Sequence, residues 1–118
     1  MAEALMNHID PEAIVLGVDT DNREAVIRLL AGKLKDAGYV KDSFADAVLA
    51  REATMPTGLP LGHAVNVAVP HTDPEHVVKP GIALATLKKP VTFANMEDPD
   101  EAVEVGLVFL MALNDKDR

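Results

Sequence analysis

The sequence predicts an α/β fold: a mixed β-sheet of about four to five strands flanked by helices. Apolar runs of strand length alternate along the chain with segments whose apolar residues recur every three or four positions, as they do in amphipathic helices. The chain has 118 residues, 48% of them hydrophobic, which suits one domain with one core. In such layered folds, ligand chemistry is expected near strand ends.

The chain begins with a predicted strand followed by a helix. Residues 13–18 are a short apolar run, and the Asp-Thr-Asp-Asn cluster at 19–22 offers side chains that cap helices. Apolar residues then recur at helical spacing between Ala25 and Ala37. Gly38 follows, where a helix commonly ends.

The next segment is predicted to form a second helix with a basic side chain on its apolar face. Asp42 or Ser43 can cap its first turn. Three- and four-residue steps place four residues on one face: Phe44, Ala47, Val48 and Arg51. Arg51 therefore extends an apolar stripe toward the core, although an arginine at a helix C-terminus can also simply offset the helix dipole and cap carbonyls.

The middle of the chain leads to a histidine just beyond a predicted strand. Residues 55–62 contain two prolines and two glycines, which predict an ordered loop. Residues 65–69 are predicted to form a short buried strand. Pro70 has no N–H to donate and pushes Val69 into an extended conformation, so strand pairing is expected to end here. His71 therefore lies beyond the ladder, held rigidly.

The last third of the chain alternates polar turns with predicted strands. A polar loop at 72–76 is followed by a predicted strand at 81–87, which Lys88-Lys89-Pro90 is expected to end. Residues 91–93 could begin another short strand. An acidic turn at 97–101 and a buried strand at 102–113 follow. The acidic turn is expected to be solvated, because like charges at this density repel one another. Residues 114–118 look like the cap and first turn of a further helix.

The composition excludes several functional classes. There is no cysteine, so disulfides, thiolate metal sites and thiol nucleophiles are excluded. The 11 basic and 19 acidic residues give a net charge of −8, which argues against nucleic acid as a partner. The longest apolar stretch, residues 105–113, is far short of the roughly 20 residues that span a bilayer. The N-terminus lacks a signal-peptide pattern, so we expect a cytoplasmic protein without membrane insertion.

His71 is the candidate reactive group. Near neutral pH an imidazole offers an unprotonated nitrogen that can attack phosphorus or bind a metal ion. His71, Asp73 and His76, together with His63, offer nitrogen and oxygen ligands of the kind that zinc takes. Their spacing on a proline-containing loop matches no established zinc signature. We therefore predict no metal site and keep a metal-binding hydrolase as a minor alternative.

Four short motifs occur in a characteristic order. They are Arg-Glu-Ala-Thr-Met-Pro-Thr-Gly at 51–58, Val-Ala-Val-Pro-His at 67–71, Lys-Pro-Gly-Ile-Ala at 79–83 and Lys-Pro-Val-Thr-Phe at 89–93. Together, over roughly residues 10–115, they resemble the enzyme IIA domains of the bacterial phosphoenolpyruvate:sugar phosphotransferase system, in the fructose/mannitol/galactitol/nitrogen-regulatory superfamily. His76, five residues after His71, resembles the galactitol branch, which implies a polyol or a related sugar.

The resemblance implies roles for individual residues. His71 would accept a phosphoryl group from the phosphocarrier HPr and give it to an enzyme IIB, which serves sugar uptake through the membrane enzyme IIC. Arg51 would lie near the phosphohistidine, where its planar fork can hold two phosphate oxygens. His63 could orient His71 or could be a plain turn residue. Thr57 and Thr72 could contact phosphate or could shape their loops.

The sequence departs from the family at two points. Members often carry a second histidine six residues before the active one, where this chain has Val65. Members also usually run further, through C-terminal helices that pack on the sheet. The resemblance therefore implies a single enzyme IIA-like domain over residues 1–118 that is truncated at its C-terminus.

The phosphate donor is expected to be a protein. The chain has no Gly-x-x-x-x-Gly-Lys loop, so neither ATP nor another cofactor is expected. A transient carrier needs docking without tight capture, which predicts a small apolar patch around His71. The same phosphohistidine could instead report phosphorylation state to a target protein, and this regulatory module is the main alternative to a transport role.

Overall fold

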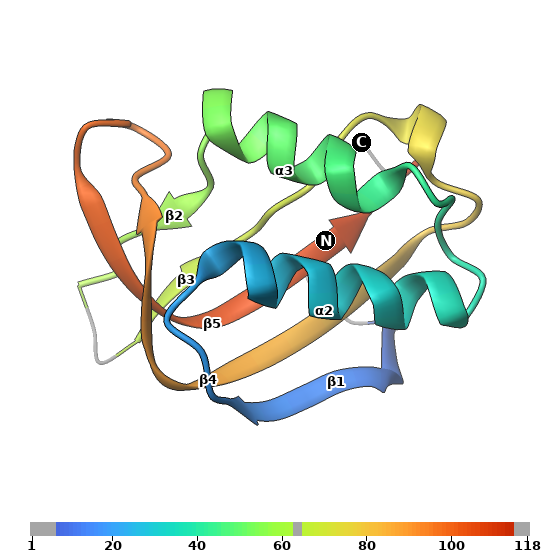
Figure 1. The fold of residues 1–118 in the computed structure, drawn as a ribbon, viewed down its shortest axis with the longest axis horizontal. Coiled ribbons are helices and arrows are strands. Elements are labelled where there is room, and N and C mark those ends of the chain that lie inside the picture. Colours follow the sequence, from blue (N-terminus) through green and yellow to red (C-terminus); the bar gives the residue numbers. More distant parts are fainter. Residues whose placement is uncertain (1–6, 63–64, 115–118) are drawn as a thin grey trace.

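The computed structural model describes residues 7–62 and 65–114 (Figure 1). In chain order their elements are β1 (Ile9–Val18), α2 (Arg23–Asp36), α3 (Phe44–Thr54), β2 (Gly58–Leu59), β3 (Asn66–Ala68), the 3₁₀ helix η1 (Pro74–His76), β4 (Gly81–Ala94) and β5 (Ala102–Ala112). None of the helices in these residues is long and apolar enough to cross a membrane.

The strands form one mixed sheet in the order β1-β4-β5-β3-β2. β1 pairs with β4 in parallel and β3 pairs with β5 in parallel, whereas the β4–β5 and β2–β3 pairs are antiparallel. Both α-helices lie in front of the sheet in Figure 1, with α2 packed on β4 and β1. The predicted α/β class, with a mixed sheet flanked by helices, is confirmed.

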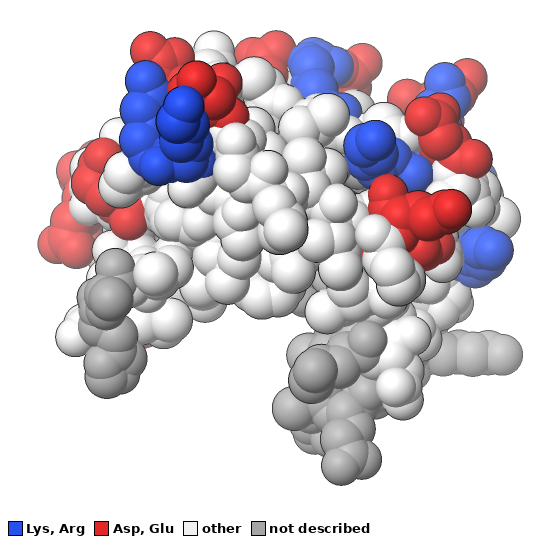
Figure 2. All heavy atoms as spheres, turned by 90° about the horizontal axis from the view of Figure 1, so that it is seen from below, with Lys and Arg blue, Asp and Glu red and all other residues white. Residues whose placement is uncertain are grey.

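The two faces of the sheet differ in what covers them. Val15, Ala85, Val108 and Ala68 are neighbours across four strands, and this row packs toward the helices. The next row, Ile14–Leu84–Phe109, points to the opposite face and is only half-buried. Figure 2 shows charged side chains along the upper rim and an uncharged, hollowed surface beneath them. One apolar face thus forms the core, and the other stays partly open among the described residues.

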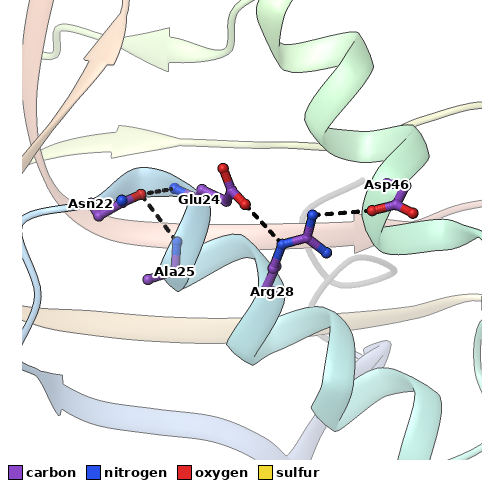
Figure 3. Close-up of polar contacts among 5 residues, drawn as sticks. All are labelled: Asn22, Glu24, Ala25, Arg28 and Asp46. Atoms are coloured by element: carbon purple, nitrogen blue, oxygen red, sulfur yellow. Dashed lines mark hydrogen bonds and ion pairs between the residues drawn. The ribbon is translucent and has the colours of Figure 1, made fainter.

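Helix α2 has a clear start signal. The side chain of Asn22 accepts hydrogen bonds from the backbone N–H groups of Glu24, at 2.8 Å, and Ala25, at 3.3 Å (Figure 3). Such a cap is worth about 1 kcal/mol. Arg28 then bridges Glu24, at 3.0 Å, and Asp46 of α3, at 3.1 Å, so it ties the two helices together on their exposed side.

The prediction that Lys88-Lys89-Pro90 ends a strand is wrong. β4 runs through these residues without a break, and residues 91–93 belong to it. The pairing with β5 becomes irregular between Thr86 and Val91, and all three residues of the tripeptide are exposed there. An irregularity of this kind accommodates a proline, because no ladder hydrogen bond is required from it.

Other element boundaries also differ from the predicted ones. β1 begins at Ile9, earlier than predicted, with an irregular register between Ile9 and Ile14. The strand before His71 is shorter than predicted, and the loop at 55–62 contains the short strand β2. The polar loop after His71 contains η1.

Candidate functional site

His71 lies just past the end of β3, as predicted. The segment before it is held on both sides. Val69 donates its N–H to the carbonyl of Thr57, at 3.3 Å, and Pro70 accepts from the N–H of Met111 in β5, at 3.0 Å. The chain therefore delivers a half-buried imidazole from a fixed backbone.

The ring of His71 is oriented by its own backbone. Its Nδ1 lies 2.9 Å from the carbonyl oxygen of Val69. A carbonyl oxygen can only accept, so Nδ1 must donate and carry the ring proton of the neutral imidazole. Nε2 is then the unprotonated nitrogen. The sequence left open which nitrogen is available, and this contact selects Nε2.

His71 opens onto a pocket of about 510 Å³ that three segments build. These are the last turn of α3, the loop that follows it and the connection between β4 and β5. The lining residues are Arg51, Thr54, Met55, Pro56, Thr57, His71, Met96 and Pro99. The pocket thus brings together His71, Arg51 and Thr57, three of the residues that the sequence singled out.

The loop after α3 is fastened to the β4–β5 connection at Gly58. Met96 donates its N–H to the carbonyl of Gly58, at 2.8 Å. A Cβ at Gly58 would stand 2.6 Å from the carbonyl oxygen of Ala94, so this close approach requires glycine. This contact brings Met96 to the pocket.

Arg51 belongs to the last turn of α3. Its side chain is 25% exposed, and Nη2 donates to Oδ1 of Asp73, at 2.5 Å. Asp73 comes from the loop after His71, so this ion pair joins α3 to the segment that carries the histidine. Arg51 is therefore engaged with another loop and is not just a dipole-compensating residue at the helix end.

Glu52 is a buried carboxylate next to the site that sequence reasoning missed. It is 6% exposed and accepts the N–H of Thr57, at 2.9 Å, and the hydroxyl of Thr57, at 2.8 Å. Burial raises the pKa of Glu52, while the Thr57 hydrogen bonds, Arg23 and His71 lower it by smaller amounts. The available signal was its position four residues after Val48, on the apolar face of the helix.

The structure describes two of the remaining candidates, and neither lines the pocket. His63 lies outside the described residues. Thr72 is half-buried and does not line the pocket. His76 places Nδ1 2.8 Å from Oγ of Ser43, at the other end of α3. The described residues hold no group of three or more histidines and carboxylates that could bind a metal ion.

Comparison with known proteins shows which family the chain resembles. Residues 7–118 match the family described as phosphoenolpyruvate-dependent sugar phosphotransferase system, EIIA 2. The transcriptional regulator ManR of Bacillus subtilis (strain 168) is 29% identical over 114 residues, which are 97% of this chain and 16% of that protein. The galactitol-specific EIIA component of Escherichia coli K12 is 32% identical over 96 residues, which are 80% of this chain and 62% of that protein.

The chain is also similar to a solved structure of an enzyme IIA. The complex of enzyme IIAMTL and phosphorylated enzyme IIBMTL from Escherichia coli matches with a TM-score of 0.73 and 29% identity, over 89% of this chain and 69% of that one. The chain spans less than two thirds of the length of the two curated relatives named above. The family match nevertheless covers almost the whole chain, and the chain belongs to the EIIA 2 family of the phosphoenolpyruvate-dependent sugar phosphotransferase system.

Proposed function

We propose that this chain is a cytoplasmic phosphoryl carrier that accepts phosphate from HPr on His71 and passes it to an enzyme IIB during sugar or polyol uptake. One observation supports this most. A histidine with Nδ1 committed to the Val69 carbonyl shares a pocket with the guanidinium-bearing side chain of Arg51. In this proposal residues 1–118 act as one enzyme IIA-like domain.

The chemistry needs alignment and charge stabilisation more than proton transfer. The lone pair on Nε2 attacks phosphorus as the bond from phosphorus to the donor breaks, and the donor keeps that electron pair. The transferred group spreads its charge over three equatorial oxygens, and Arg51 can donate to two of them. The Nδ1–H bond to Val69 holds the ring in line and stabilises the positive charge that grows on it. Transfer to the acceptor reverses these steps.

The other candidates take supporting roles. The Thr57 hydroxyl donates to Glu52, which suits shaping the loop better than binding phosphate. Thr72 could offer its hydroxyl or its amide to phosphate. Because the Val69 carbonyl already orients the ring of His71, the role left for His63 is to donate to the phosphoryl oxygens. No ATP, other cofactor or metal ion is needed, because the phosphoryl group arrives on a protein.

The rim of the pocket suits brief contact with other proteins. Met55 is 60% exposed and Met96 is 41% exposed, and both line the pocket. Flexible, polarizable methionine side chains adapt to more than one partner surface. A carrier that must release both HPr and an enzyme IIB benefits from such a small, adaptable patch. The net charge of −8 would steer a basic partner.

A polyol is the favoured transport substrate class. The chain is similar to a galactitol-specific EIIA component and to the IIA mannitol of Escherichia coli, and both of these names refer to a polyol. The sugar itself would bind elsewhere, on the membrane enzyme IIC. The substrate proposal therefore rests on similarity and not on the pocket.

A regulatory role is the second candidate. The transcriptional regulator ManR is similar over 97% of this chain, so the same domain occurs in a protein named for regulation. In that setting the phosphohistidine would report its state to a target and would not feed a transporter.

Transfer from phosphoenolpyruvate tests the proposal. Purified enzyme I and HPr would be mixed with the wild type and with His71→Ala, His63→Ala and His76→Ala, and acid-labile phosphate would be scored by intact mass. Labelling should be lost only in His71→Ala, and His76→Ala serves as the control because that ring lies away from the pocket. Passage of the label to an enzyme IIB of the galactitol or mannitol type would favour transport. A wild type that takes no label from HPr would refute the proposal.

A further inference from the structure

The ion pair between Arg51 and Asp73 spans two segments that both belong to the candidate site. Arg51 is on the last turn of α3, and Asp73 is two residues after His71. The Nη2–Oδ1 distance is 2.5 Å, and the two side chains are 25% and 48% exposed. The contact therefore joins the two pieces of chain that must keep a fixed distance if Arg51 is to meet a phosphoryl group on His71.

The loop that carries Asp73 is held at both ends. Pro70 accepts from Met111 before it, and the carbonyl of His76 accepts the N–H of Lys41 after it, at 3.0 Å. Val77 then pairs with Val40 in an isolated bridge. A carboxylate on a loop fixed in this way is a rigid acceptor for a long, flexible side chain.

The carboxylate of Asp73 does not cap its own helix. Asp73 is the N-cap residue of η1, with extended backbone angles, yet its side chain makes no capping hydrogen bond there. Capping is the ordinary local use of an aspartate at that position. Here the carboxylate is directed across the site to Arg51 instead.

We infer that Asp73 is a positioning residue that holds the guanidinium of Arg51 ready for the phosphoryl group on His71. This inference rests on the proposed function. The guanidinium has five N–H donors, so a bond from Nη2 to Asp73 leaves Nε and Nη1 able to donate to phosphate oxygens. Holding Arg51 before the donor arrives removes the rotamer entropy that Arg51 would otherwise lose during transfer.

The negative charge of Asp73 also allows an opposite role, in which Asp73 competes with the phosphoryl group for Arg51. A carboxylate close to a phosphoryl group repels it, so an Asp73 that only competed for Arg51 would slow transfer, and its removal would accelerate transfer. A positioning Asp73 predicts the opposite. Its removal should slow transfer, and only while Arg51 is present.

A double-mutant cycle on phosphoryl transfer from HPr measures whether the effect of Asp73 depends on Arg51. Asp73→Ala should lower the first-order transfer rate at saturating donor by roughly tenfold, and Asp73→Asn, which keeps an acceptor oxygen, should restore part of it. In an Arg51→Ala background Asp73→Ala should cause no further loss. Glu75→Ala is the matched control, because it removes one negative charge from the same loop at an exposed residue. Equal losses in both backgrounds, or faster transfer by Asp73→Ala, would overturn the inference.

A second measurement does not depend on the partners. The ¹H–¹⁵N heteronuclear NOE of the Arg51 Nε–H should show an ordered guanidinium in the wild type and in Glu75→Ala, and a mobile one in Asp73→Ala. If Arg51 is as ordered in Asp73→Ala as in the wild type, the positioning role of Asp73 is refuted, even if His71 is phosphorylated as proposed. A wild type that takes no label would end the proposed function, while this NMR comparison would still decide whether Asp73 holds Arg51.

Discussion

The buried carboxylate of Glu52 accepts two hydrogen bonds from one residue, the backbone N–H of Thr57 at 2.9 Å and its hydroxyl at 2.8 Å. The carbonyl of Thr57 in turn accepts the N–H of Val69, whose own carbonyl orients His71. A short series of hydrogen bonds thus connects the last turn of α3 to the imidazole of His71. Glu52 therefore supports the site without lining the pocket.

Glu52→Ala should destabilise the protein. The change leaves the N–H of Thr57 without its acceptor inside the structure, a loss of about 1–3 kcal/mol in the free energy of unfolding. Urea unfolding followed by circular dichroism measures it. Glu75→Ala, at an exposed carboxylate, should stay within about 0.5 kcal/mol of the wild type. Equal stabilities for the two variants would show that the Thr57 contacts contribute little.

The raised pKa of Glu52 predicts a pH dependence. The folded state binds this proton more tightly than the unfolded chain, because burial opposes the charged form. The resulting stability is fully present below the ordinary glutamate pKa and is lost as pH rises through the folded value. The free energy of unfolding of the wild type, minus that of Glu52→Gln, should therefore fall as pH is raised through this window. A difference that grows with pH would contradict the raised pKa.

Phosphorylated protein should carry its phosphate on Nε2 of His71. The carbonyl of Val69 occupies Nδ1–H, so only Nε2 has a free lone pair in the neutral ring. Long-range ¹H–¹⁵N correlation of the imidazole, before and after phosphorylation, distinguishes the two isomers. Phosphate on Nδ1 would mean that the ring leaves Val69 during transfer.

Arg51→Ala should slow phosphoryl transfer without preventing folding. Loss of a positioned donor for transition-state charge costs on the order of 10²–10³ in rate. Arg51→Lys should recover only a fraction, since an ammonium group cannot hold two oxygens in a planar fork. Arg28→Ala is the control, because Arg28 pairs with Glu24 and Asp46 (Figure 3) and does not line the pocket. Similar transfer rates for the two alanine variants would remove Arg51 from the mechanism.

Asn22→Ala should weaken the fold and spare the chemistry. It removes the acceptor for the N–H groups of Glu24 and Ala25, which costs about 1 kcal/mol. The midpoint of thermal unfolding should drop, and the rate of labelling of His71 at a temperature where the protein stays folded should not change. Asp21→Ala, next to it and exposed, should leave the unfolding midpoint unchanged.

Local physics explains which features the sequence could predict. The end of the ladder before His71 was predictable, because proline acts on its own residue and on the one before it. The start of α2 was predictable for the same reason, since Asn22 caps within its own turn. The position of Arg51 in the pocket followed from resemblance to a family and not from helical spacing.

The features that the sequence did not predict depend on contacts between distant residues. β4 continues through Pro90 only because its pairing with β5 becomes irregular there. β2 exists because Gly58 and Leu59 find partners in β3. The Arg51–Asp73 pair joins residues separated by 22 positions, a distance that no local pattern reveals. Such features require the assembled sheet.

The acceptor that sets the tautomer of His71 is a main-chain carbonyl and not a side chain. Position 69 can therefore change its side chain without altering which ring nitrogen is available, provided that the backbone path before Pro70 is kept. The choice of the nitrogen that we propose to react therefore does not depend on the side chain at position 69. The methionines at the pocket rim could therefore be exchanged to suit other partners while the nitrogen proposed to react stays the same.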